Sequence, residues 1–308
     1  MNTPRFRNGV SMNQLRFSLV TCLAGALVSA PAARAQTEID QTRPAAADVR
    51  LSVDLINGKV LITGWDKKEV HVGGTLGEDV EELFVEGREE RIHIEVDVPD
   101  RWHGHTRGTE LDIHAPKGAR VHVDGVNVAI EVSNIEGRLI LGTVNGAVTV
   151  AGNPETLAME TVNGPLRFTG SCNEVVAEAV SGGIELEGVT GRVSAQTVSG
   201  GIQVTGGAFT GASFSTVSGQ IDFRGSLHGT GIFDFESHSG TVTLLLDDEP
   251  SAEFDIETFS GSIDSDFGPE PSPKRRWGPG KEMSFTVGKG AAQVTITSFS
   301  GVVRIRKR

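Results

Sequence analysis

Four side chains near the end of the chain have the chemistry of a ligand-binding site. Lys274, Arg275, Arg276 and Trp277 lie within DFGPEPSPKRRWGPG, residues 266–280, a segment with four prolines. An indole ring stacks on the apolar face of a sugar, and guanidinium groups bind acidic groups through paired hydrogen bonds. Loops of this length are uncommon and often functional. We interpret the four residues as a candidate binding site; a solvated insertion at a corner of the fold is the alternative explanation.

A second loop, DRWHGHTRG at 100–108, places His103 and His105 two residues apart. Two such histidines could share a metal ion with another histidine of the surrounding strands. No cysteine or glutamate stands at a recognisable metal-binding spacing around them, so we expect exposed histidines and no metal site.

The common catalytic motifs are missing from the sequence. It contains no G-x-S-x-G, no H-E-x-x-H and no phosphate-binding P-loop. We therefore predict no catalytic residues, no cofactor and no enzymatic activity. Carboxylates are numerous, however, and a stack of strands can hold an extended sugar chain. A polysaccharide lyase or hydrolase is thus the alternative prediction.

The positions of these residues depend on a phrase that the chain repeats around a glycine. Copies include TVNGAVTV, AVSGGIEL, TVSGGIQV and SFSGVVRI, and successive glycines are 18, 18, 18, 19, 21, 21 and 40 residues apart. Self-similarity with a period near 20 is typical of stacked repeat folds. The glycines of the eight copies are Gly146, Gly164, Gly182, Gly200, Gly219, Gly240, Gly261 and Gly301.

Apolar residues stand two before, two after and four after most of these glycines, as in Val198, Ile202 and Val204. Even spacing indicates strands, and it predicts that all three positions share one buried face. We predict an all-β fold, a single-domain β-solenoid with rungs of roughly 20 residues. The glycine would mark a bend where a side chain collides with the inner face or φ is positive.

Polar residues repeat as well, three and one before the glycine, as in Thr161 and Asn163. Such a regular array of hydroxyl and amide groups could bind a partner with a regular surface, such as ice or a crystalline polysaccharide. A hydrogen-bonded ladder between rungs explains it more simply, and we expect the ladder.

Composition predicts three parts of the chain. Residues 1–35 resemble a signal peptide, because arginines precede the apolar stretch 17–28 and APAARA ends the segment. The apolar stretch is too short for a transmembrane anchor. Residues 36–48 indicate a linker, and 49–308 the solenoid, with 49–125 as a diverged N-terminal cap. The interval 266–280 is its insertion loop. At the other end Arg304, Arg306, Lys307 and Arg308 close the last strand with charge.

Charge and cysteine content limit the possible partners. The 308 residues carry a net charge of −12, and loss of the four arginines in residues 1–35 would make it −16. Nucleic-acid binding needs a basic surface, so we expect no nucleic-acid partner. Cys172 is the single cysteine outside the predicted signal peptide, so no disulfide is expected within the mature chain. We expect a monomer.

LINGKVLITGWDKKEVHV and IHAPKGARVHVDGVN, followed by serial units such as TVSGGIQV, resemble the bacterial putative adhesin family of exported β-solenoid domains. The likeness covers residues 49–308. It implies a β-solenoid, a location outside the cytoplasm and an adhesive or structural role, and it supplies no catalytic residues. We therefore expect an exported, non-enzymatic protein, periplasmic, secreted or on the cell surface. Its expected partner is a polysaccharide or protein of the cell envelope or the extracellular space.

Overall fold

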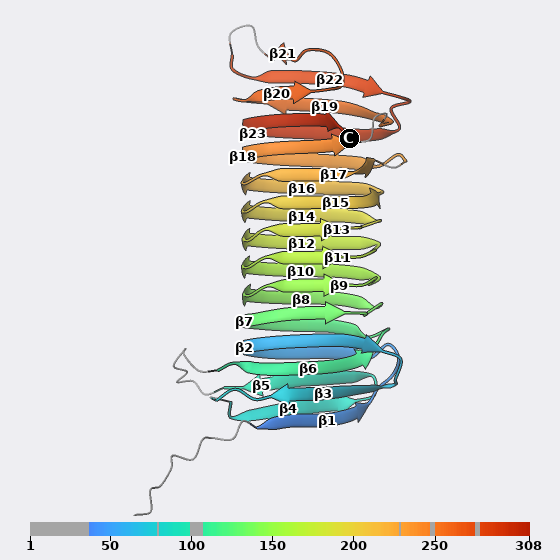
Figure 1. The fold of residues 1–308 in the computed structure, drawn as a ribbon, viewed down its shortest axis with the longest axis vertical. Helices are drawn as coiled ribbons and strands as arrows, with labels where there is room; N and C mark the ends of the chain where they lie inside the picture. Colours follow the sequence, from blue (N-terminus) through green and yellow to red (C-terminus); the bar gives the residue numbers. More distant parts are fainter. Residues whose placement is uncertain (1–36, 79, 99–106, 228, 247–249, 275–277) are drawn as a thin grey trace, which may run out of the picture. The chain divides into compact units, whose positions relative to one another are not determined.

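The computed structural model describes residues 37–78, 80–98, 107–227, 229–246, 250–274 and 278–308. These residues form 23 strands and no helix, and the unit Gln36–Arg308 is a stack of strand rungs (Figure 1). The predicted all-β solenoid is confirmed. None of the described residues belongs to a helix that could cross a membrane.

The central rungs each consist of two strands joined at a glycine corner. Equivalent residues of neighbouring rungs pair in parallel, so that Leu157 lies between Leu139 and Val175, each 18 positions away. The repeat length of the sequence is thus the circumference of one rung. The strands are β8 (Arg138–Asn145), β9 (Val148–Ala151), β10 (Thr156–Asn163), β11 (Leu166–Thr169), β12 (Glu174–Ser181), β13 (Ile184–Glu187), β14 (Arg192–Ser199), β15 (Ile202–Phe209), β16 (Gly211–Ser218) and β17 (Ile221–Leu227).

The core runs through the inside of the stack. Residues two and four after the glycines, such as Ile202 and Val204, are buried as predicted; the half-buried Ser265, four after Gly261, is the exception. Towards the C-terminal end phenylalanines fill the interior, and the rings of Phe214, Phe223 and Phe235 contact one another with centroids 5.4 to 6.0 Å apart. A single rung could not bury this surface, because each rung is covered by its neighbours.

The corner glycine is required by the rung beneath it. A Cβ at Gly182 would lie 1.8 Å from the carbonyl oxygen of Gly164, and one at Gly200 would lie 2.1 Å from that of Gly182. Close approach of two backbones therefore selects glycine here. The prediction of a collision was correct, but its partner is the neighbouring rung and not the inner face.

The N-terminal end is a cap of mixed strands. Strand β2 pairs in parallel with β7 on one side, and with β5 and β6 on the other. Strand β3 is antiparallel to β6 and β1, and β4 is antiparallel to β5. This is the diverged cap that the irregular repeats predicted. Its strands and the first long strand above them are β1 (Glu38–Pro44), β2 (Arg50–Trp65), β3 (Glu69–Thr75), β4 (Glu82–Arg88), β5 (Arg91–Asp97), β6 (Thr109–Pro116) and β7 (Arg120–Ser133).

Strand β1 lies in the segment 36–48, for which we expected a linker. Its residues pair with β3 from Glu38↔Thr75 to Pro44↔Glu69, and Ile39 is buried against the core. The polar composition of this segment suits an edge strand, since one of its faces is exposed.

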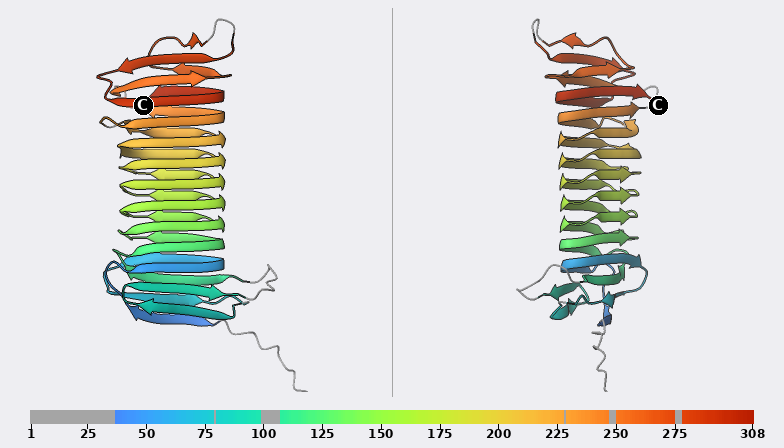
Figure 2. Two further views of the ribbon diagram at one scale, coloured as in Figure 1. Left: turned by 180° about the vertical axis from the view of Figure 1, so that it is seen from behind. Right: turned by 60° about the vertical axis from the view of Figure 1, so that its left-hand side comes forward.

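The C-terminal end has a crossover that the sequence did not predict. The last strand, β23 (Ala292–Lys307), lies between β18 (Ile232–Leu246) and β19 (Ala252–Thr258), parallel to both. Strand β20 (Ser262–Ser265) also pairs with β23. The end of the stack is instead β22 (Lys281–Val287), antiparallel to β19, with the two-residue β21 (Ser272–Pro273) beside it. Figure 1 labels the strands in this order, and Figure 2 shows the dark red β23 on the inner side of the orange strands that end the stack.

The basic residues of the last strand therefore do not close an open edge, and that prediction was wrong. Arg306 pairs with Asp264 of β20 and, at 3.2 Å, with Asp266. The hydrogen bond from Arg306 holds the pKa of Asp264 below its usual value. These ion pairs join β23 to β20 and to the segment that directly follows β20.

Candidate functional site

A column of apolar side chains lies exposed along one corner of the stack. It consists of the residues two before the corner glycine, or their equivalents. The exposed fractions of its aliphatic and phenylalanine side chains are between 38% and 61%, and His238 is exposed as well. We predicted these positions to be buried, and that prediction was wrong. In stacking order this apolar column is Ile56, Val126, Val144, Val162, Val180, Val198, Val217, His238, Phe299 and Phe259.

The error comes from the corner itself. Before the glycine the inward residues stand at odd offsets, such as Thr197 and Ala195, and after it at even offsets, such as Ile202. Two successive residues, Val198 and Ser199, both face outward where the direction of the strand changes. Strict alternation holds within a strand and fails across a bend.

Threonines three before the glycine lie inside and join the rungs. The Thr143 hydroxyl donates to the carbonyl of Val128 at 3.0 Å, and Thr197 donates to that of Gly182 at 3.1 Å. Exposed asparagines one before the glycine form a second ladder, with Asn163 donating to Asn145 at 2.8 Å. The expected ladder between rungs is thus present.

Aromatic rings end the apolar column at its C-terminal side. The ring of Phe299 stacks on His238 at 4.7 Å and on Phe259 at 4.8 Å, with interplanar angles of 3° and 6°. The crossover of β23 makes this stack, since it inserts Phe299 between residues that are 21 positions apart in the sequence. The rings face each other along the stack, so their edges point to solvent.

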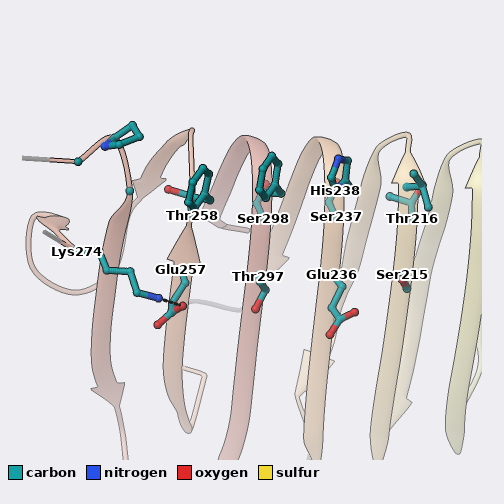
Figure 3. Close-up of a pocket in the computed structure, with 16 residues that line it drawn as sticks. Ser215, Thr216, Glu236, Ser237, His238, Glu257, Thr258, Lys274, Thr297 and Ser298 are labelled. Carbon is teal, nitrogen blue, oxygen red and sulfur yellow. Dashed lines mark hydrogen bonds and ion pairs between the residues drawn. The ribbon is translucent and has the colours of Figure 1, made fainter.

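A groove of about 730 Å³ follows this aromatic end. Figure 3 shows Glu236, Thr297 and Glu257 on successive strands below the rings, with Lys274 paired to Glu257. Residues 278–280 also line this groove. The groove therefore combines apolar ring edges with carboxylates and hydroxyls, as expected for a surface that binds a polar chain with apolar faces.

Lys274 is the member of the predicted binding site that the structure places. It lines the groove beside Phe259, and its ion pair with Glu257 neutralises one carboxylate there. Arg275, Arg276 and Trp277 lie outside the described residues. The aromatic stack itself was missed, because the order of the last rungs is not visible in the repeat pattern.

Three buried hydroxyls behind the aromatic end differ from the threonines of the earlier rungs. Among the described residues, the oxygens of Ser237, Thr258 and Ser298 have no hydrogen-bond partner. Buried polar atoms usually have partners. The ladder of hydroxyl-to-carbonyl bonds therefore ends where the aromatic stack begins.

Metal binding and the thiol of Cys172 are two further possible sources of chemistry in the chain. Within the described ranges, no group of three or more histidine, cysteine or acidic side chains could hold a metal ion. His103 and His105 lie outside these ranges. Cys172 is buried, its thiol donates to the carbonyl of Glu174 at 3.1 Å, and burial raises its pKa. A thiol with a raised pKa is a poor nucleophile.

Comparison with known protein families shows to which family this chain belongs. The family model described as Toastrack DUF4097 matches residues 50–306. The chain belongs to the Toastrack family. This membership confirms the adhesin-like resemblance of the repeated motifs. No curated protein matches the chain.

Solved structures similar to this Toastrack chain include putative adhesins and a putative lipid binding protein. One is a putative adhesin from Bacteroides fragilis NCTC 9343, with 12% identity, a TM-score of 0.40 and coverage of 88% of this chain and 97% of that one. Another is a putative lipid binding protein from Parabacteroides distasonis ATCC 8503, with 13% identity, a TM-score of 0.41 and coverage of 86% and 96%. A putative adhesin from the same strain has 12% identity, a TM-score of 0.35 and coverage of 87% and 97%.

Proposed function

We propose that this Toastrack protein is an exported, non-enzymatic binding module whose apolar column holds a polysaccharide of the cell envelope or the extracellular space. The observation that carries the proposal is the column of nine exposed aliphatic and phenylalanine side chains, in register with His238. Contiguous apolar surface of this kind on a monomer marks a binding site. Export rests on the signal-peptide pattern of residues 1–35 and places the protein in the periplasm, in the medium or on the cell surface.

The flanks of the apolar column favour a sugar chain. On one side the residues four before the glycine include exposed or half-buried Glu160, Glu178 and Glu236. On the other side lie the asparagines and serines one before the glycine. Carboxylates, amides and hydroxyls bond sugar hydroxyls, while apolar side chains cover the C–H faces of sugar rings. The acidic flank and the net charge of −12 favour a neutral polysaccharide over an acidic one.

Co-sedimentation with neutral insoluble polysaccharides and with envelope fractions tests this proposal. Wild-type protein should bind saturably. Replacing Val162, Val180 and Val198 by threonine keeps the β-branched shape but removes apolar contact area, and affinity should fall by about tenfold, or roughly 1.4 kcal/mol.

The matched control changes outward residues of the strands that follow the corner, β9, β13 and β15. Thr149, Glu185 and Gln203 lie three after their glycines and are exposed or half-buried. Their replacement by alanine should change affinity less than about twofold, within 0.5 kcal/mol. Equal losses in both triple variants, or no saturable binding by the wild type, would contradict the proposal.

The segment 266–280 is the second part of the proposed surface. Lys274 lies at the groove, and Arg275, Arg276 and Trp277 directly follow it in the sequence. A variant with Arg275, Arg276 and Trp277 changed to alanine separates this segment from the apolar column. Weaker binding in this variant alone would make the segment the main site, and weaker binding in both variants would make the surface continuous.

A polysaccharide-active enzyme remains the second candidate because two carboxylates share the groove. Glu236 and Glu257 both pair with Thr297, one on each side, so their Cα atoms are about 9.6 Å apart, twice the strand spacing. Inverting glycosidases hold two carboxyl groups roughly 6.5–9.5 Å apart, a separation that glutamate side chains can reach from Cα atoms at this spacing. Release of reducing ends by the wild type, lost in Glu236→Gln, would favour the enzyme; binding without release favours the module.

A further inference from the structure

Four arginines form one column on the first rungs of the stack. Arg50 of β2 pairs in register with Arg91 of β5 on one side and Arg120 of β7 on the other. Arg138 of β8 follows Arg120, because the register β7–β8 continues from Val121↔Leu139. Neighbouring strands are about 4.8 Å apart, so the four side chains leave the sheet within roughly 14 Å along the stack. All four are exposed and line one groove of about 520 Å³.

Acidic side chains balance this arginine column incompletely. Asp48 lies 3.6 Å from Arg120, and Glu90 lines the adjoining groove with Arg50 and Arg91. Within the described part of the chain, Arg50, Arg91 and Arg138 form no ion pair. Like charges at paired positions of neighbouring strands repel each other. An acidic chain that stacks four arginines in register thus keeps an unbalanced positive charge at one place.

A second column of outward side chains, two residues further along each strand, lies beside the arginine column and includes His93 and His122. His93 lies 3.3 Å from Glu95 and 3.7 Å from Asp54, and His122 lies 2.6 Å from Asp124. These carboxylates are engaged with imidazoles and not with the arginines. The guanidinium groups therefore line a groove whose other side is the neighbouring column of His93, Ser52, His122 and the half-buried Ile140.

We propose that the arginine column binds a ligand with two or more neighbouring phosphate groups. Guanidinium groups bind phosphate oxygens with paired hydrogen bonds, and adjacent arginines can share one phosphate. A row of four suits a row of phosphates, whereas a single carboxylate would leave most of the column unpaired. The site is independent of the apolar column, since Arg50 and Ile56 are six residues, or about 20 Å, apart along β2.

Calorimetric titration with tripolyphosphate tests the site on protein purified after expression of the full chain. Saturable binding that weakens as salt increases is expected. The double variant Arg50→Gln/Arg120→Gln should lose at least about tenfold in affinity, because it removes the two central charges.

Arg192→Gln is the matched control. Arg192 occupies the same column on β14, but its neighbours are Glu174 and Gly211, so its loss should change affinity less than about twofold. Unchanged circular dichroism of all variants shows that the stack is folded. An equal loss in Arg192→Gln, or inorganic phosphate binding as tightly as tripolyphosphate, would overturn the proposal.

Vesicles distinguish the source of the phosphates. Flotation with phosphatidylglycerol vesicles but not with phosphatidylcholine vesicles, lost in the double variant, would identify anionic lipid headgroups as the ligand. Binding of tripolyphosphate without vesicle binding would identify a soluble polyphosphate. No saturable binding to either one would overturn the site.

Discussion

At the scale of single residues, the corner glycine and its neighbour have opposite tolerance for a side chain. A Cβ at Gly200 would lie 2.1 Å from the carbonyl oxygen of Gly182, whereas one at Gly201 meets only the carbonyl of Gln220, at 3.5 Å. The two positions are adjacent in the sequence and share the composition of the phrase. They differ in how closely the backbone of a neighbouring rung approaches them.

Gly200→Ala should therefore destabilise the stack by about 1–3 kcal/mol, because two backbones must move apart. Gly201→Ala should be neutral or stabilise by up to about 1 kcal/mol, because it restricts the unfolded chain without a clash. Urea unfolding followed by circular dichroism measures both as shifts of the midpoint. A Gly200→Ala midpoint equal to that of Gly201→Ala would show that the corner is not in close contact.

The sequence predicts the inside of the stack well and its corner poorly. Val204 and Ile202 are buried as their spacing indicates, but Val198 is exposed because the alternation changes at the glycine. The spacing of apolar residues suggests one continuous alternation of buried and exposed positions through the repeated motif, and it gives no sign of the bend at the glycine. The apolar column, and with it the candidate site, was therefore hidden in the part of the pattern that looked most like core.

At the scale of elements, strand β23 is the piece on which the C-terminal end depends. It pairs with β18 over 14 residue pairs and with β19 and β20 on its other side. Removing it would leave long unpaired edges on both neighbours. The phrase around Gly301 resembles that around Gly261, and nothing in either copy reveals that Gly301 pairs with Gly240. The crossover could not be predicted for this reason.

Truncation after Ala291 should convert the protein into soluble oligomers or aggregates, since β18 then presents an open edge. Size-exclusion chromatography with light scattering measures this change. Truncation after Arg306 removes only the last two residues and should leave a monomer with an unchanged elution volume. A monomer in both cases would mean that β18 and β19 can pair directly.

At the scale of the whole stack, each rung contacts only the rungs beside it. Long-range register is therefore carried by the repeat length, and stability is a sum over neighbours. Residues 183–200 make up one full repeat, and β12 would meet β16 directly if they were removed, in the same register that now joins β12 to β14.

Deletion of residues 183–200 should give a folded protein with the same type of circular dichroism spectrum and a modestly lower urea midpoint. Deletion of 183–191 removes half a rung, shifts every later residue to the wrong side, and should give an unfolded or aggregated chain. The comparison rests on the 18-residue register alone. Equal behaviour of the two deletions would refute it.

The crossover at β23 also sets an order of events when the chain is made. Strands β19, β20 and β22 leave the ribosome before β23, yet in the native arrangement β19 has no parallel neighbour until β23 lies beneath it. The growing chain can stack rungs one by one as far as β18, but the next rung cannot form until β23 has been synthesised. The sixteen-residue strand β23 completes the aromatic stack and its pairing with β19 in one step, so that only a chain synthesised through β23 can form that surface.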